Sequence, residues 1–235
     1  MLTRRLLTRR TLPALVPALL AAHPGRAQTA TSLQLVLAVD ASGSVNMARF
    51  VLQRSGYAAA FRHAAVRSAI RGTATGAIAA LMLQWTGPEM QVVTVDWTRI
   101  DSDAAADRFA DAIDAAPRSL FGGGTSISGA IDFAADQFPR CPYPADRRVI
   151  DVSGDGQNNR GRTADAARDA AVQAGIVING LPILALEPWL DAYYRDHVIG
   201  GPGAFLIAAA SFEEFAQAIR RKLITEIAEL SPRYG

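Results

Sequence analysis

The apolar residues of this chain fall into short runs that end at polar loops. The first run, Leu33–Val39, is almost unbroken and ends at Asp40, which is typical of a strand buried on both faces of a sheet. In residues 47–70 apolar positions recur at helical spacing, at Phe50, Tyr57, Phe61, Ala65 and Ile70. The folded part of the sequence therefore begins with a strand, a polar loop and a helix.

The rest of the pattern alternates strands with helices. The apolar runs Ala77–Trp85 and Val92–Trp97 are separated by the turn sequence Thr86–Glu89, which predicts an antiparallel hairpin. Helices are expected at residues 101–116, 125–138, 163–174 and 211–227, and strands at residues 148–153, 176–186 and 204–209. This order predicts a doubly wound α/β domain. Its sheet is mainly parallel and six-stranded, with helices on both faces and one antiparallel edge strand.

The first 27 residues differ from the rest of the chain. They hold five arginines and no Asp or Glu, and the apolar stretch Leu12–Ala22 leads to the small residue Ala27. This pattern is typical of an export signal cleaved after residue 27, and the pair Arg9–Arg10 leaves the general and twin-arginine routes open. No segment after it is long enough to span a bilayer. We expect a signal peptide at 1–27, a domain at 28–235 without a membrane span, and a periplasmic or secreted bacterial protein.

Composition and charge narrow the function. Half of the residues are hydrophobic and 20% are charged, as in folded globular proteins. Without the signal segment the formal net charge falls from +2 to −3, so the domain lacks the clustered positive charge that nucleic acid requires. The single cysteine, Cys141, excludes a disulfide scaffold.

Three loops that begin helices carry small oxygen-bearing residues. They are Asp40–Ser44 (Asp-Ala-Ser-Gly-Ser), Gly123–Ser126 (Gly-Gly-Thr-Ser) and Ser153–Gly156 (Ser-Gly-Asp-Gly). In doubly wound sheets, ligands bind at the edge where such loops lie. Carboxylates and hydroxyls together suit a hard divalent cation, Mg²⁺ above all. Each serine or threonine alone is also an ordinary helix N-cap, whereas an aspartate at the end of a buried strand is costly without a partner.

These three motifs, in this order, resemble the metal-ion-dependent adhesion site of von Willebrand factor type A domains, and the resemblance covers residues 33 to about 230. It implies that Mg²⁺ or Mn²⁺ is held by Asp40, Ser42, Ser44, Thr125 and Asp155. The serines would bind directly, Thr125 directly or through water, and the aspartates mostly through water. One coordination position would stay open for an acidic group of a protein partner.

Finer features resemble an uncharacterised proteobacterial branch of that family, known as a domain of unknown function. They lie in residues 150–159, 178–181 and 193–204. Asp151 departs from the family pattern, which usually has an aliphatic residue in the fourth strand. A buried carboxylate needs a partner, and Arg147 or Arg148 is nearest in the sequence. Asn158 and Asn159 lie close to the site, and we expect them to be turn residues.

The expected function is a cation-dependent protein-binding module that is not an enzyme. Two alternatives stay open: a metal-assisted periplasmic hydrolase and a structural domain with a vestigial site. Enzymatic motifs are weak, because Asp40–Ser44 is not the Gly-x-Ser-x-Gly elbow and Gly122–Thr125 lacks the lysine of a phosphate-binding loop. After residue 27 the only histidines are His63 and His197, which we expect on the surface or in packing.

Overall fold

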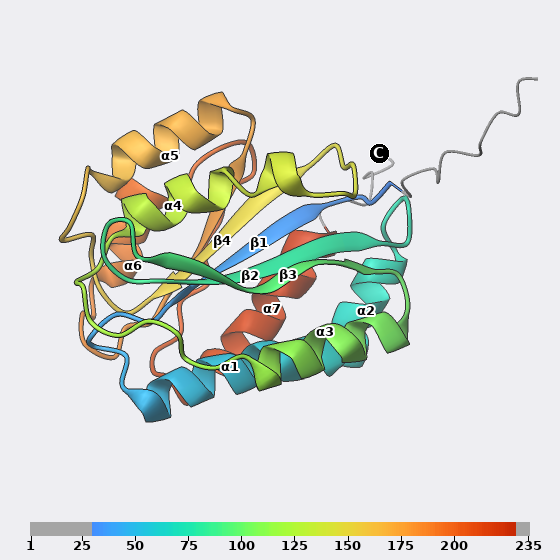
Figure 1. The fold of residues 1–235 in the computed structure, drawn as a ribbon, viewed down its shortest axis with the longest axis horizontal. Coiled ribbons are helices and arrows are strands. Elements are labelled where there is room, and N and C mark those ends of the chain that lie inside the picture. The colour runs from blue at the N-terminus through green and yellow to red at the C-terminus, as the bar shows by residue number, and fades with distance from the viewer. Residues whose placement is uncertain (1–29, 229–235) are drawn as a thin grey trace, which may run out of the picture.

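A computed structural model describes residues 30–228 of the chain. The signal peptide expected at residues 1–27 lies outside the described residues and stays a prediction. Within them, a central sheet is covered by helices on both faces (Figure 1). No helix in this part of the chain is long and apolar enough to cross a membrane.

The sheet has five strands in the order β3-β2-β1-β4-β5. Their bounds are Gln34–Asp40 for β1, Ile78–Trp85 for β2, Gln91–Ile100 for β3, Arg148–Gly154 for β4 and Val177–Pro182 for β5. All neighbours pair in parallel except β2 and β3, which form the predicted hairpin. The α/β class and the antiparallel edge strand are therefore confirmed.

The prediction of a sixth strand at residues 204–209 is wrong. This segment lies alongside β5, and its backbone bonds are Gly180 N to Phe205 O at 3.1 Å, Ile207 N to Gly180 O at 3.1 Å, Ala209 N to Pro182 O at 3.0 Å and Leu184 N to Ala209 O at 2.9 Å. In a continuous parallel ladder the next donor after Gly180 N would be the backbone N–H at position 182, and Pro182 has no N–H. The sixth position is therefore reduced to isolated bridges.

Helices cover the sheet in two groups (Figure 1). One face carries α1 (Met47–Arg62), α2 (Ala64–Arg71), α3 (Asp103–Ala115) and α7 (Phe215–Ala228), and the other carries α4 (Ile127–Ala135), α5 (Ala164–Gln173) and α6 (Leu190–Tyr193). A 3₁₀ turn at Phe138–Arg140 and a π-helix at Tyr194–Val198 complete the set. The single helix expected at residues 47–70 is split, because His63 is extended and caps α2.

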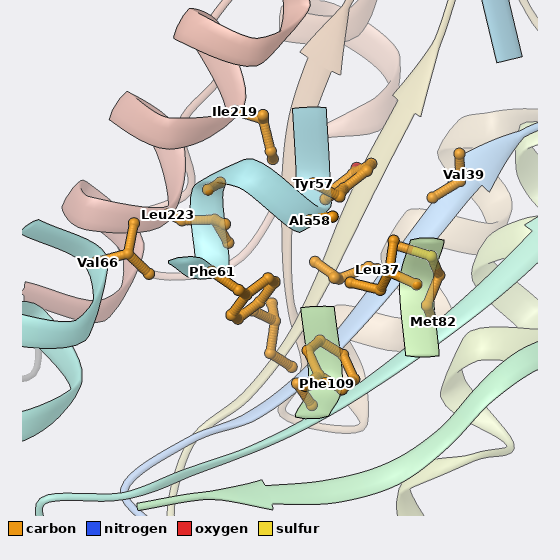
Figure 2. Close-up of a cluster of buried hydrophobic side chains, with 14 of the residues drawn as sticks. Leu37, Val39, Tyr57, Ala58, Phe61, Val66, Met82, Phe109, Ile219 and Leu223 are labelled. Carbon is orange, nitrogen blue, oxygen red and sulfur yellow. The ribbon is translucent and has the colours of Figure 1, made fainter. Parts of the chain in front are cut away.

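The central strand β1 is buried along its whole length and divides the core in two. Leu37 and Val39 pack on one side with Tyr57 of α1, as Figure 2 shows. Val36 and Ala38 pack on the other side, under α4 and α5. Because both faces of β1 are covered, its end is rigidly placed, and the loop after it inherits that position.

The partner of the buried Asp151 is neither Arg147 nor Arg148. The only lysine of the chain, Lys222 of α7, places its Nζ 2.7 Å from Asp151 Oδ1, and both side chains are 0% exposed. Burial raises the pKa of Asp151 from 3.8 to about 7, although the charge of Lys222 opposes the shift. The sequence missed this pair because it joins β4 to a helix about 70 residues later.

Further polar groups extend this pair across the sheet. Lys222 Nζ lies 3.4 Å from Glu226 Oε2, and Asn179 Nδ2 donates to Glu226 Oε1 at 2.7 Å. The side-chain oxygen Oδ1 of Asn179 accepts a hydrogen bond from Phe205 N at 2.9 Å. This buried network therefore ties α7 to β4, to β5 and to the segment beside β5.

Candidate metal centre

The two aspartates of the predicted site end neighbouring parallel strands. Asp40 is the last residue of β1, and Asp155 directly follows β4. The strands pair with Val39 opposite Ser153, so their carboxyl ends meet at one edge of the sheet. The backbone N–H of Asp155 donates to Asp40 Oδ2 at 3.4 Å. The fold thus places the two carboxylates side by side.

Short hydrogen bonds join these aspartates to the serines of the first loop. Ser42 N donates to Asp40 Oδ1 at 2.7 Å, which folds the loop back over the carboxylate. The hydroxyl oxygens of Ser42 and Ser44 are 3.1 Å apart, and Ser44 Oγ donates to Asp155 Oδ1 at 2.5 Å. Four of the five residues predicted to hold the cation therefore form one connected cluster.

The fifth predicted ligand, Thr125, comes from the loop that leads into α4. Its Oγ1 lies 3.9 Å from the place that a Cβ would take at Gly156, the residue after Asp155. Before it, the glycines at 122, 123 and 124 have φ values of 72°, 91° and 87°, a left-handed backbone that other residues rarely adopt. The glycines let the loop turn tightly enough to bring Thr125 beside the aspartate loop.

Asn158 and Asn159 do more than shape a turn. Thr125 N donates to Asn159 Oδ1 at 2.9 Å, and Asn159 N donates back to Thr125 O at 2.8 Å. Asn158 Oδ1 accepts from Ser128 N at 3.0 Å. Both amides therefore hold the Thr125 loop against the loop after β4, a role that their spacing in the sequence could not show.

Burial governs the charge state of the aspartates. Asp40 is 0% exposed, and desolvation followed by repulsion from Asp155 raises its pKa from 3.8 to about 7. Desolvation also raises the pKa of Asp155, while the hydrogen bond from Ser44 and the charge of Arg49 oppose the rise. Two buried carboxylates at this spacing need either a proton or a cation to offset their repulsion.

Arg49 forms an ion pair with this cluster, and sequence reasoning missed it. Its Nη1 lies 3.7 Å from Asp155 Oδ2 and donates to Ser44 O at 2.8 Å. The guanidinium also lies over the Phe212 ring, 5.1 Å from its centroid. Arg49 lies in the first turn of α1, so the start of the helix positions it beside the loop Asp40–Ser44.

Several buried polar atoms around the cluster have no hydrogen-bond partner among residues 30–228. They include Asp155 Oδ2, Tyr194 Oη, Trp85 Nε1 and Glu187 Oε2. A Cβ at Gly154 would lie 2.9 Å from Tyr194 Oη and 3.1 Å from Asp40 Oδ2. The Tyr194 hydroxyl and the Asp40 carboxylate therefore both lie against Gly154, where the missing side chain leaves room for them. Buried polar groups are nearly always satisfied, often by ordered water. These atoms therefore fit a hydrated cation.

Carboxylates alone do not make this site. In the described part of the chain, no three His, Cys, Asp or Glu side chains are close enough together to hold a metal ion. Asp40 and Asp155 would need the hydroxyls of Ser42, Ser44 and Thr125 to complete a ligand set. Such an all-oxygen set suits a hard cation and not a soft one.

The two histidines make contacts of their own. His63 Nδ1 accepts from Ala65 N at 3.1 Å as the cap of α2. His197 Nδ1 lies 3.0 Å from Asp165 Oδ1, and that contact is the main cause that lowers the pKa of Asp165. Both side chains are thus engaged in structural contacts.

The sheet order and the loops at its carboxyl edge define the protein as a von Willebrand factor A-like domain. A von Willebrand factor type A structure from Catenulispora acidiphila is similar, with a TM-score of 0.50, 16% identity, and coverage of 86% of this chain and 43% of that one. Within this class, the chain belongs to the family described as "Protein of unknown function (DUF1194)", whose model matches residues 30–231. The resemblance expected from the sequence is confirmed.

Two further solved structures have a similar fold. Proximal thread matrix protein 1 from the mussel byssus, with a zinc-occupied MIDAS motif, gives a TM-score of 0.61 at 17% identity, covering 86% of this chain and 47% of that one. The pilus adhesin SpaC from Lactobacillus rhamnosus GG gives 0.60 at 14% identity, covering 88% and 31%. The chain therefore spans less than half of either protein. No curated protein matches the sequence significantly.

Proposed function

We propose that the chain is a divalent-cation-dependent protein-binding module of the adhesion type. The observation that carries this proposal is the connected cluster of Asp40, Ser42, Ser44 and Asp155, with Thr125 beside it. Its oxygens belong to rigid strand ends and tight loops, and Asp155 Oδ2 has no hydrogen-bond partner among the described residues. We propose Mg²⁺ or Mn²⁺ as the cation, because both accept all-oxygen ligand sets.

The proposed partner is a protein that presents a carboxylate. A bound cation with mostly hydroxyl ligands would act as a Lewis acid that attracts an acidic group. The chain's own residues would set the geometry: Arg49 holds Asp155, and Asn159 holds Thr125. Similar folds in an adhesin and in a byssus protein with a zinc-occupied motif support this proposal.

We do not propose an enzyme. A hydrolase needs a positioned base beside the cluster, and the contacts of His63 and His197 with Ala65 and Asp165 favour structural roles. A vestigial site would leave the cluster unable to bind any cation. Binding of the metal alone therefore separates the adhesion-type proposal from a vestigial site.

The first experiment measures Mg²⁺ and Mn²⁺ binding by calorimetry on the wild type, Asp155→Ala and the double variant Ser42→Ala/Ser44→Ala. Wild type should bind one cation, and both variants should lose it while staying folded by circular dichroism. Asp146→Asn is the matched control, because it removes one exposed carboxylate at the amino end of β4, at the opposite edge of the sheet. Wild-type protein that binds neither ion would overturn the proposal.

We also propose that the protein is exported to the periplasm or beyond. The arginine cluster and apolar stretch before Gln28 motivate this, since such segments direct secretion. Sequencing the N-terminus of protein recovered from periplasm should give a start near residue 28. An intact Met1 on cytoplasmic protein would contradict it.

A further inference from the structure

Most of the large apolar side chains that stay exposed in residues 30–228 lie near the candidate metal centre. They are Met47 at the start of α1, Phe121 in the loop before α4, and Leu186 and Trp189 between β5 and α6, whereas Val51 and Leu52 lie further along α1. The start of α1, the loop into α4 and α6 lie together on the left of Figure 1. Isolated apolar residues are normal on a surface, but a group of them at one edge indicates an interaction site.

Phe121 is the most exposed of the group, at 61%, yet its position is fixed. The Arg118 guanidinium lies 4.8 Å from the centroid of the Phe121 ring. Arg118 Nη2 donates to Ala41 O at 2.9 Å and to Ser42 O at 3.1 Å, and Nε donates to Leu120 O at 3.1 Å. The ring is thereby held beside the loop Asp40–Ser44 before any partner arrives, which lowers the entropic cost of using the ring as a contact.

Leu186 and Trp189 lie in the segment that approaches the loop Ser153–Gly156. Between them, Glu187 Oε1 lies 3.5 Å from the place that a Cβ would take at Gly156. Leu190, fully buried, anchors the end of the segment, and its N donates to Glu187 O at 3.0 Å. Trp189, 60% exposed, is therefore presented at the start of α6 by a well-anchored turn.

Positive charge accompanies these apolar side chains. Arg118 and Arg160 form no ion pair with an acid of the described residues, and the one ion pair of Arg49 is with Asp155, at 3.7 Å. Arg160 is exposed next to Thr125, whose carbonyl accepts from its backbone N at 3.2 Å. An acidic group arriving at the metal centre therefore meets complementary charge and apolar surface together.

We infer that the partner is a protein segment whose metal-binding carboxylate is flanked by large apolar side chains, and that Phe121 and Trp189 are their contacts. This inference rests on the proposed function of the metal centre. Aromatic side chains at the centre of an interface carry much of its affinity when they are covered on binding. The carboxylate supplies dependence on the cation, and the apolar flanks supply selectivity among acidic segments.

A displayed library of short random peptides with one fixed central Glu tests the inference. It is selected on the Mg²⁺-loaded protein and eluted with chelator, beside a matched library with a fixed Gln. Enriched Glu peptides should carry Leu, Ile, Phe or Trp next to the Glu. Affinity for one such peptide should fall about tenfold or more in Phe121→Ser and in Trp189→Ser, while Mg²⁺ affinity stays unchanged.

Val51→Ser is the control, because Val51 is exposed one turn further along α1 than Met47 and should not affect the affinity. Acidic peptides enriched without apolar neighbours, or undiminished binding by Phe121→Ser and Trp189→Ser, would overturn this inference and leave the metal-dependent function standing. Failure of the wild type to bind Mg²⁺, or to retain any chelator-sensitive peptide, would overturn the proposed function as well.

Discussion

Replacing Lys222 by methionine should destabilise the protein more than any single surface change. The ammonium group is 0% exposed and lies 2.7 Å from Asp151 and 3.4 Å from Glu226, so it is the cation between two buried carboxylates. Methionine keeps the length and apolar character of the side chain. Lys222→Met therefore removes the charge with little change in volume.

The magnitude follows from the burial of the carboxylates. Removing one partner of a buried ion pair costs about 3–5 kcal/mol, because the remaining charge stays desolvated. In a domain of this size each kcal/mol lowers the melting temperature by about 2–4 °C, which gives a fall of about 6–20 °C. Since the raised pKa of Asp151 allows the carboxylate to take up a proton, the loss should be larger at pH 8 than at pH 5.

Urea unfolding of wild type and Lys222→Met at both pH values measures the cost, with Arg71→Met as control. Arg71 Nη1 lies 2.6 Å from Asp103 Oδ1, nearly the distance of the buried pair, but the two side chains are 55% and 60% exposed. Such a pair contributes about 0–1 kcal/mol. A cost for Lys222→Met below about 1 kcal/mol at pH 8, equal to that of Arg71→Met, would refute the reasoning.

Three further predictions concern the metal centre. Mg²⁺ at a hundredfold excess over its dissociation constant should add about 2.7 kcal/mol of stability, a rise of about 5–11 °C in melting temperature that Asp155→Ala abolishes. Because burial raises the pKa of Asp40 from 3.8 to about 7, the metal-free protein should lose stability as pH rises through this range, and calorimetry should show Mg²⁺ affinity rising over it. Asn159→Ala should weaken Mg²⁺ binding by releasing Thr125 N. Gln157→Ala in the same loop is the control.

Each of the three has a contrary outcome. Coincident melting curves in Mg²⁺ and chelator would show that the cluster holds no cation. Stability of the metal-free protein that rises between pH 4 and 7 would mean that other groups outweigh Asp40. Equal Mg²⁺ affinity in Asn159→Ala and wild type would mean that the glycines before Thr125 alone place the loop.

The positions of the two aspartates could be predicted because they depend on local pattern and one topological rule. Asp40 and Asp155 each follow a short apolar run, and parallel strands bring such ends to the same edge. The positions of Ser42 and Ser44 could be predicted as well, because both lie in the loop that Asp40 begins. The cluster at the strand ends is therefore a consequence of sequence order.

Contacts between segments that are distant in the sequence could not be predicted from it. Asn159 faces Thr125 across 34 positions, and Tyr194 meets Asp40 only because the chain turns back after β5. The Lys222–Asp151 pair is of the same kind, since the arginines nearest in the sequence donate to backbone carbonyls, Arg147 to that of Glu226 and Arg148 to that of Ala174. The missing strand at 204–209 had a local cause, Pro182, but it lies on the neighbouring strand, where a pattern in the segment itself gives no sign of it.

Pro182 of β5 also determines which segment should detach from the sheet first. Where the strand lacks a donor, the segment at 204–209 is attached by separate contacts and not by a continuous ladder, so it can detach without breaking the five strands beside it. The amide hydrogens of Ile207 and Ala209 should then exchange with solvent much sooner than those of β1 and β4. Since Asn179 links this segment to Glu226 of α7, detachment of the segment should also loosen α7, while the strand ends that carry Asp40 and Asp155 should keep their hydrogen bonds.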